Sequence, residues 1–382
     1  MPKPLRPLTV LQVIPALEVG GAERGTVDIA TALVAAGHRA LVASSGGRMV
    51  LDLEKTGVQH YDRDLRTKDP LKIIANAFWL RRLILEQNVD IIHARSRAPA
   101  WSAWLAASLT KTAFVTTFHA AYTGANFFMK HLYNSVMARG QRVIAISEFI
   151  ARYIRKNYNV DPRRIITIHR GISFAYFNPL AVSESRKSAL REELDLKRGV
   201  KTIIMPGRLS PVKGQNLVID ALAKIKDIPY TCTFIGPDQG RSTYRHRLKK
   251  SAEEYGIADR IRWAEFIDLP AAYVLADLVL SPSQQAEGFG RVPVEAAAMG
   301  TPVIATALGA TDETVINDES GFLVPPGNVE VLAQAIRRTL SFTKAERTAF
   351  AEKAIRHVHA HFNVKQMCAA TLKVYEEVAD LK

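Results

Sequence analysis

The stretch SPSQQAEGFGRVPVEAAAMGTPVIATALG, from Ser281 to Gly309, decides how we interpret the fold of this sequence. The apolar residues from Ala276 to Leu280 just before it predict a strand, and the residues from Ser281 to Gly290 predict a loop. Gly288 and Gly290 allow the backbone of that loop to approach a ligand closely. The stretch therefore predicts the order strand, loop, helix, strand.

A short helix is predicted after this loop. Pro293 suits the first helical position, and Gly300 ends the helix before Pro302 and the β-type run from Val303 to Thr306. Free backbone N–H groups at the start of a helix that follows a strand attract hydroxyls and anions. The pattern therefore predicts a ligand site where this helix begins.

Two glutamates can serve that site, Glu287 in the loop and Glu295 in the expected first turn of the helix. An ionised carboxylate only accepts hydrogen bonds, so two of them can hold two sets of hydroxyls, such as those of a hexose and of a ribose. Two glutamates at this spacing also occur by chance in many helices. The spacing alone therefore leaves the function open.

The motifs around these glutamates resemble those of a known enzyme family. Glu287-Gly-Phe-Gly, then Glu295, then Gly-Thr-Pro-Val-Ile-Ala-Thr is similar to the E-x7-E signature of retaining glycosyltransferases of family 4, which have the GT-B architecture. The segment GRLSPVKGQ from Gly207 resembles the phosphate-binding segment of that family, and GFLVPPG from Gly321 continues the pattern. With gaps, the resemblance extends from about Val10 to Phe362.

The resemblance implies two Rossmann-like, doubly wound α/β domains facing a central cleft. A chain of 382 residues is long enough for two domains of ordinary size. We expect an acceptor-binding domain over residues 1–180, a domain that binds a nucleotide-sugar over 181–363, and a C-terminal helix over 364–382 that crosses back onto the first domain. A polar linker is expected near Asn178 to Arg198.

The donor site is expected in the second domain. Arg208 and Lys213 follow the predicted strand Thr202 to Pro206 and precede a helix, which suits a diphosphate, although such a pair alone leaves the function open. By resemblance these two cations would neutralise the donor diphosphate, and the loop at Phe266 would approach the base. The other donor-binding residues that the resemblance implies here are Glu287, Gly288, Phe289, Gly290 and Glu295.

The first domain is expected to open with the strand Val10 to Ile14 and the helix Ala22 to Ala36. Gly20 and Gly21 lie between them, at the carboxyl end of the strand, where open α/β sheets bind ligands. The spacing is not the G-x-G-x-x-G fingerprint, which disfavours a nicotinamide cofactor. A Gly-Gly pair alone is more often a tight turn, but in the resembled family this loop covers the donor phosphate.

Other polar residues follow later strands of this domain. His119 ends the predicted strand from Ala113 to Phe118, and by resemblance it contacts the donor sugar near the reacting carbon. We therefore group His119 with Glu287, Arg208 and Lys213 as the expected catalytic residues. Histidine inside an apolar face would instead be a core residue by default.

Three arginines are candidate anion contacts. Arg95 and Arg97 follow the predicted strand Val89 to His93; they either bind acceptor phosphate or are exposed loop charges. Arg170 stands where the family more commonly has asparagine, and we expect it to add a donor phosphate contact.

Charge is distributed unevenly along the chain. The net charge is +14, and residues 1–180 carry 24 Lys and Arg against 12 Asp and Glu. A basic first half suggests an anionic partner such as a phosphorylated glycolipid or a membrane surface, or else simply a solvated surface. No repeat of basic and aromatic residues tracks a nucleic-acid strand, so nucleic acid is not an expected partner.

Several features bear on location. Cys232 and Cys368 are the only cysteines, which favours a reducing cytoplasm over a disulfide framework. Lys3 and Arg6 precede an apolar run, but there is no small-residue cleavage site, and no stretch is long and apolar enough to cross a membrane. Between Tyr122 and Arg139 aromatics alternate with cations, as at a membrane interface or in ordinary amphipathic packing. The aromatic and basic residues of that segment include Phe127, Phe128, Lys130, His131 and Tyr133.

The resemblance, together with the basic first half, implies a retaining transferase that moves a hexose from a nucleotide-sugar to an anionic glycolipid acceptor, similar to bacterial enzymes of lipopolysaccharide core synthesis. It would act peripherally at the inner face of the cell membrane. No cofactor is expected and no metal, because acidic residues do not cluster as a hard cation requires. The alternatives are a nucleotide-sugar epimerase of the same fold, a transferase with a soluble or polymeric acceptor, and a basic nucleic-acid-binding protein.

Overall fold

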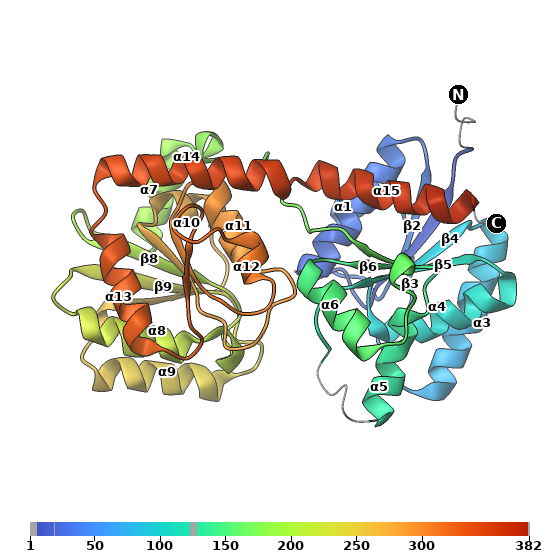
Figure 1. The fold of residues 1–382 in the computed structure, drawn as a ribbon, viewed down its shortest axis with the longest axis horizontal. Coiled ribbons are helices and arrows are strands. Elements are labelled where there is room, and N and C mark those ends of the chain that lie inside the picture. Colours follow the sequence, from blue (N-terminus) through green and yellow to red (C-terminus); the bar gives the residue numbers. More distant parts are fainter. Residues whose placement is uncertain (1–5, 19, 123–127, 381–382) are drawn as a thin grey trace. The chain divides into compact units, whose positions relative to one another are not determined.

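The computed structural model describes residues 6–18, 20–122 and 128–380, and it forms two compact units (Figure 1). Unit 1 comprises Met1–Gly171 and Val364–Lys382, and unit 2 comprises Ile172–Asn363. Strands and helices alternate in both units, and each unit has one parallel sheet. The prediction of two Rossmann-like, doubly wound domains is therefore confirmed.

Unit 1 is built on a sheet of seven strands in the order β3-β2-β1-β4-β5-β6-β7. Its central strands are buried on both faces and are mostly apolar, as in Val10 to Val13 and Ala113 to Val115. The strands are β1 (Thr9–Val13), β2 (Arg39–Ser44), β3 (Gln59–Asp62), β4 (Ile91–Ala94), β5 (Ala113–Phe118), β6 (Arg142–Ala145) and β7 (Ile165–Thr167). The helices are α1 (Gly21–Ala35), α2 (Val50–Glu54), α3 (Pro70–Glu86), α4 (Arg97–Thr110), α5 (Phe128–Ser135), α6 (Glu148–Asn157) and α15 (Val364–Asp380).

Unit 2 is built on a sheet of six strands in the order β10-β9-β8-β11-β12-β13. The strands are β8 (Lys201–Pro206), β9 (Tyr230–Ile235), β10 (Ile261–Ala264), β11 (Leu278–Ser281), β12 (Val303–Thr306) and β13 (Phe322–Val324). The helices are α7 (Glu184–Glu193), α8 (Gln215–Leu222), α9 (Ser242–Glu254), α10 (Leu269–Leu275), α11 (Arg291–Ala298), α12 (Thr311–Thr314), α13 (Val329–Leu340) and α14 (Lys344–His361).

Each sheet has one point where the order of strand addition reverses. In unit 1 this switch point lies between β1 and β4, and in unit 2 it lies between β8 and β11. All the strands in a sheet are parallel, so the loops that leave the two central strands emerge side by side at one edge. Open α/β sheets bind their ligands at this place.

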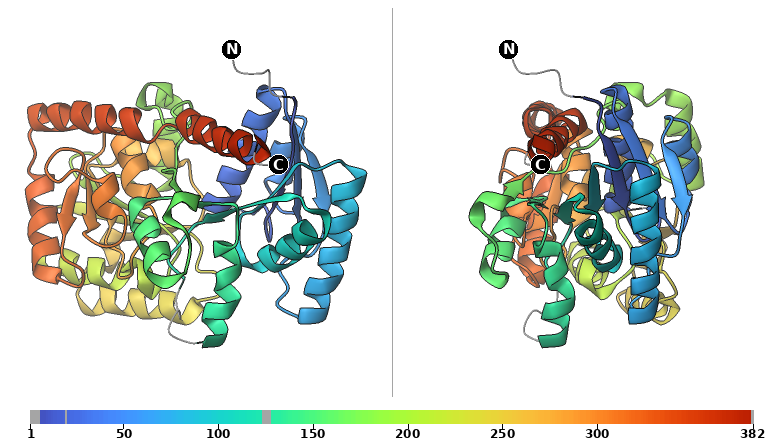
Figure 2. Two further views of the ribbon diagram at one scale, coloured as in Figure 1. Left: turned by 45° about the vertical axis from the view of Figure 1, so that its right-hand side comes forward. Right: turned by 90° about the vertical axis from the view of Figure 1, so that its right-hand side faces the viewer.

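Helix α15 belongs to unit 1 although it follows unit 2 in the sequence, and it lies alongside α1 (Figures 1 and 2). Its inward face joins the core of unit 1. The Tyr375 hydroxyl lies 2.6 Å from Nδ1 of His93 in β4, and Nε2 of His93 lies 2.8 Å from Oγ1 of Thr117 in β5. All three side chains are buried, so this chain of hydrogen bonds ties α15 to the centre of the sheet.

The predicted polar linker near Asn178 to Arg198 is wrong, because this segment lies within unit 2 and its middle, Glu184–Glu193, is helix α7. Ser183 caps this helix by accepting a hydrogen bond from the Arg186 backbone N–H, and the Arg186 guanidinium binds both oxygens of Asp268 at 2.5 and 2.6 Å. Leu190 is its one buried residue. A helix that buries so little apolar surface has a polar sequence that resembles a linker.

No helix in the described part of the chain is long and apolar enough to cross a membrane. Of the residues considered above, Lys3 and Phe127 lie outside the described ranges. Both cysteines, Cys232 and Cys368, are buried and free.

Replacing Tyr375 with phenylalanine should destabilise unit 1 by about 1–3 kcal/mol, because it leaves Nδ1 of buried His93 without its partner while the ring packing is kept. Urea unfolding measures the loss. Tyr133→Phe is the matched control, because the Tyr133 hydroxyl has no hydrogen-bond partner among the described residues. Equal stability of the Tyr375→Phe and Tyr133→Phe variants would contradict the role of α15 as an anchored helix.

Stability should also fall as the pH is lowered. Burial, followed by the nearby Arg95, holds the pKa of His93 well below its ordinary value of 6.5, so below that pH the unfolded chain binds the extra proton. The stabilisation is thus present above pH 6.5 and is lost at up to about 1.4 kcal/mol per pH unit below it. Urea unfolding at several pH values should show a shallower dependence for His93→Gln than for wild type. A control, His246→Gln at an exposed site, should keep the wild-type slope.

Candidate functional site

The switch point of unit 2 brings together the loops after β8 and β11. Gly214, which directly precedes α8, has a left-handed φ of 82°, and a Cβ at this position would collide with the carbonyl oxygen of Pro282 in the other loop. The Gln284 backbone N–H donates to the Val212 carbonyl at 2.7 Å. Only glycine allows this close approach, so the two loops form one continuous surface.

Across this surface Lys213 and Glu287 form an ion pair, with Nζ 2.7 Å from Oε1. The Ser283 hydroxyl donates to the same carboxylate oxygen, while Oε2 has no hydrogen-bond partner among the described residues. The side chains of Lys213 and Glu287 are 22% and 23% exposed, so a ligand can reach both. Lys213 can therefore bind an anion, and Glu287 can accept a hydrogen bond from a hydroxyl.

The backbone of Glu287 is held in place by the loop that follows β12. Its carbonyl accepts a hydrogen bond from the Ala310 N–H at 3.0 Å, and Glu287 and Gly309 form a parallel β-bridge. A Cβ at Gly309 would lie 2.5 Å from the Glu287 oxygen, and φ of Gly309 is 79°. Gly309 therefore has to be glycine for the loop to keep this position.

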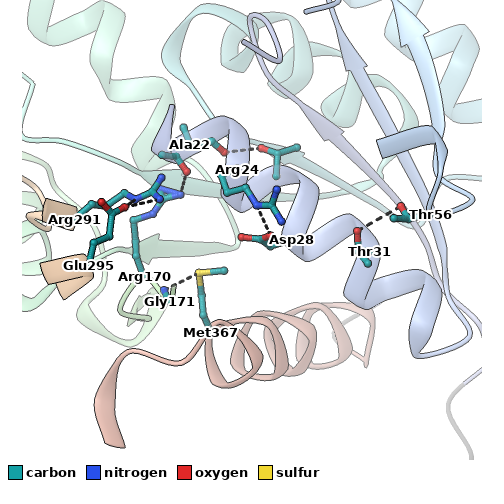
Figure 3. A network of polar contacts seen from close by, with 12 residues as sticks. Ala22, Arg24, Asp28, Thr31, Thr56, Arg170, Gly171, Arg291, Glu295 and Met367 are labelled. Atoms are coloured by element: carbon teal, nitrogen blue, oxygen red, sulfur yellow. Dashed lines mark hydrogen bonds and ion pairs between the residues drawn. The ribbon is translucent and has the colours of Figure 1, made fainter. Parts of the chain in front are cut away.

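Glu295 is buried and held by two neighbours. Its Oε2 accepts the Tyr273 hydroxyl at 2.9 Å, and its Oε1 accepts Nε and Nη2 of Arg291 at 3.0 and 2.8 Å (Figure 3). Burial, together with the Glu295 carboxylate, raises the pKa of Tyr273 well above its ordinary value, so this hydroxyl remains a donor. A carboxylate has about four acceptor positions, so a ribose hydroxyl can still bind beside these partners.

The predicted start of the central helix needs correction. Helix α11 begins at Arg291, so Pro293 is its third residue rather than its first, and Glu295 is its fifth. The left-handed Gly290, with φ of 77°, precedes the helix and turns the chain into it. Proline is accepted at the third position because the N–H groups of the first turn have no partner within the helix. The register places Arg291 four residues before Glu295, which allows their ion pair.

The remaining donor-binding candidates lie on the same unit with different exposure. Arg208 is exposed, and its Nη1 donates to the Gln239 side chain at 3.2 Å. Phe266, in the loop after β10, is 59% exposed. The Phe289 ring is buried against Phe362, so Phe289 has only its backbone to offer a ligand, as has the adjacent Gly288.

Gly20 and Gly21 follow β1 at the switch point of unit 1, and Arg170 and His119, which follow β7 and β5, lie beside them. Gly20 precedes α1 with an extended backbone, and the Arg170 guanidinium donates to the Gly21 carbonyl. Another Arg170 nitrogen, Nη1, lies 3.1 Å from Nδ1 of His119. A guanidinium only donates, so Nδ1 accepts and the imidazole proton lies on Nε2.

His119 is therefore a neutral donor. Burial, and then the charges of Arg170 and Arg95, lower its pKa well below its ordinary value. Its Nε2 is buried and has no hydrogen-bond partner among the described residues. Leaving such a donor unsatisfied is costly, so this Nε2–H is available to an oxygen acceptor.

Arg95 and Arg97 have different partners in the structure, although they are close in the sequence. Arg97 begins α4, where it donates to Oδ1 of Asn134 at 3.0 Å and lies over the Tyr122 ring at 4.2 Å. Arg95 is 3% exposed and reaches towards α1, where its Nη2 would lie 3.0 Å from a Cβ at Gly25. Sequence reasoning missed Gly25, although a glycine inside a predicted helix is a signal of close approach.

Among the described residues no group of three or more His, Cys, Asp or Glu side chains is placed to hold a metal ion. The polar residues at both switch points are instead arginine, lysine, histidine and paired glutamate. They suit phosphate and sugar hydroxyls.

Two family profiles match the chain, one in each unit. Glycosyltransferase Family 4 matches residues 19–176, and Glycosyl transferases group 1 matches residues 186–357. The second match contains the loops around Lys213, Glu287 and Glu295. Between them the two profiles cover most of both sheets.

Individual relatives agree with these matches. A glycosyltransferase from Rickettsia africae ESF-5 is 34% identical, with a TM-score of 0.90 over 98% of this chain and 99% of that one. HepE from Anabaena, solved in complex with UDP-glucose, is 25% identical, with a TM-score of 0.84 over 96% of this chain and 100% of that one.

A D-inositol 3-phosphate glycosyltransferase from Jonesia denitrificans is 28% identical over 75% of this chain and 71% of its own length. The alignments with three such curated relatives cover between 52% and 71% of each relative's own length. With both profiles and the full-length structural relative in agreement, the chain belongs to glycosyltransferase family 4, the group 1 glycosyl transferases.

Proposed function

We propose that this protein transfers a hexose, with retention of configuration, from a nucleoside diphosphate sugar to an anionic glycolipid acceptor such as lipopolysaccharide core. The observation that carries the proposal is the Lys213–Glu287 ion pair at the switch point of unit 2. A cation for the diphosphate and an acceptor for sugar hydroxyls meet there on rigid loops. The likeness to a structure that contains UDP-glucose supports a nucleotide-sugar donor.

Within unit 2 the donor groups divide by chemistry. Lys213 and Arg208 balance the charge of the diphosphate, which increases as the sugar–phosphate bond breaks. Glu287 accepts hydrogen bonds from the sugar hydroxyls through Oε2, and backbone N–H groups near Gly290 also bind the sugar. Glu295 accepts hydrogen bonds from the ribose hydroxyls. Phe266 is exposed beside the expected base position.

Transfer requires the bond between C1 of the sugar and the phosphate oxygen to break and a bond from C1 to the acceptor oxygen to form. We propose attack from the face that the diphosphate leaves, with the acceptor proton passing to the departing phosphate. Lys213 and Arg208 stabilise that phosphate, and His119 holds a sugar hydroxyl through its Nε2–H. No covalent sugar–enzyme bond is needed in this scheme.

The acceptor is assigned to unit 1. Its two segments carry 27 Lys and Arg against 15 Asp and Glu, while unit 2 is close to neutral. On helix α5, Phe128 and Met129 are 79% and 72% exposed beside Lys130, which suits an anionic membrane surface at the inner face of the cell membrane. The inositol phosphate relatives favour a second candidate, a soluble phosphorylated acceptor.

Replacing Lys213 or Arg208 with alanine should weaken UDP-glucose binding about tenfold or more, a loss of about 1.4 kcal/mol each, because a charged contact to the diphosphate is removed. Calorimetric titration of each variant measures this loss. The control is Lys224→Ala in the same unit, where the exposed lysine pairs with Glu330. Wild-type affinity in both test variants would contradict the donor site. Conversion of UDP-glucose alone into an isomer would favour an epimerase instead.

Transfer should continue after excess chelator is added, within about twofold of the untreated rate, because lysine and arginine rather than a divalent ion balance the diphosphate charge. The release of UDP in the presence of acceptor measures the rate. Loss of activity that added Mg²⁺ or Mn²⁺ restores would show that a metal is required.

A further inference from the structure

Arg95 is a buried cation without an ionic partner. Its side chain is 3% exposed, its Nε is buried without a hydrogen bond, and neither a salt bridge nor a side-chain hydrogen bond joins it to the described residues. Buried arginines are normally paired, because an unpaired buried charge is costly. Burial accordingly lowers the pKa of Arg95.

A second guanidinium reaches the same point of helix α1. Nη2 of Arg170 would lie 2.5 Å from a Cβ at Gly25, and Nη2 of Arg95 would lie 3.0 Å from it. The two arginines come from different loops, after β7 and after β4, and converge because residue 25 has no side chain. His119, which contacts Arg170, adds a buried Nε2–H without a partner among the described residues.

The carboxylates near this cluster do not bind Arg95. Asp28 accepts Nε of Arg24 at 2.9 Å, and Glu23 folds back towards Gly20 at the start of α1. The cluster is therefore rich in donors, and Gly20 and Gly21 place the N-terminal end of α1 beside it. Donors of this kind bind a phosphate group well.

We propose that Arg95 and Arg170 form a subsite in unit 1 for a phosphate-class dianion carried by the acceptor, while His119 beside them keeps its Nε2–H for the donor sugar. This subsite is separate from the Lys213 and Arg208 contacts to the donor diphosphate in unit 2, and it rests on the proposed function. It assigns a phosphorylated acceptor, either a glycolipid or a soluble sugar phosphate. Arg97 takes no part, because Asn134 and Tyr122 engage its guanidinium.

The test titrates inorganic phosphate, at low ionic strength, into the full chain saturated with UDP, so that the donor contacts are already filled. Wild type should bind phosphate, Arg95→Gln should bind it about tenfold or more weakly, and Arg95→Lys should recover part of the affinity. The control is Arg163→Gln, which removes an exposed arginine of the same unit that pairs with Asp161. The affinity of Arg95→Gln for UDP should stay within about twofold of the wild-type value. This result would show that the variant is folded and keeps its donor site.

Thermal melting without ligand separates this role from a structural one. Removing an unpaired buried charge should leave the melting temperature of Arg95→Gln unchanged or higher, and phosphate should then stabilise only the wild type. A clear fall in melting temperature, or equal phosphate affinity in both proteins, overturns the proposal. The proposal is also overturned if UDP displaces the bound phosphate and Arg95→Gln weakens UDP binding, because the subsite then belongs to the donor. If UDP-sugars bind nowhere while phosphate still depends on Arg95, the proposed function fails and the anion subsite stands.

Discussion

The parallel order of the strands is the constraint on which both candidate sites depend. Because every strand of a sheet ends at the same edge, residues from loops far apart in the sequence meet at the switch point. In unit 2 this constraint brings Lys213, which follows β8, to Glu287, which follows β11. Gly214 and Gly309 then allow the loops to approach closely enough for the ion pair to form. The strand order brings the two loops together, and the opposite charges of the two side chains then form the pair.

The two units balance their charges differently. Unit 2 holds its carboxylates in internal pairs, Lys213 with Glu287 and Arg291 with Glu295, so a ligand enters by competing for groups that are already oriented. Such groups need little rearrangement when an anion develops. In unit 1, Arg95 and Arg170 converge with His119 where no carboxylate balances Arg95. An incoming anion can contact Arg95 there without first displacing a carboxylate from its guanidinium.

The sequence was sufficient to predict the fold class and the family, because both rest on local patterns. Predicted strands such as Ala113 to Phe118 and Tyr230 to Ile235 are present with those bounds, since long buried runs of β-branched and aromatic residues are unambiguous. Helix α7 was missed because it buries only one residue, and β3 because its four residues are partly exposed. Neither element has a strong hydrophobic pattern.

The site was predicted less completely. Motif residues such as Glu287 and Lys213 were found, but their mutual contact is tertiary and leaves no trace in spacing. The same is true of the partners of Glu295, and of Arg97, whose position beside Arg95 in the sequence does not reveal its contact with Asn134. Phe289 lies inside the motif and is nevertheless part of the core. Sequence identifies groups that can bind, while burial and pairing decide which of them are available.

The crystal structure of the full chain with UDP-glucose is the most direct test of this account. We expect the diphosphate oxygens within hydrogen-bond distance of Lys213 and Arg208, the sugar hydroxyls on Glu287, and the ribose on Glu295. A diphosphate bound instead to Arg95 and Arg170, with the Lys213–Glu287 pair untouched, would contradict the assignment of the donor to unit 2.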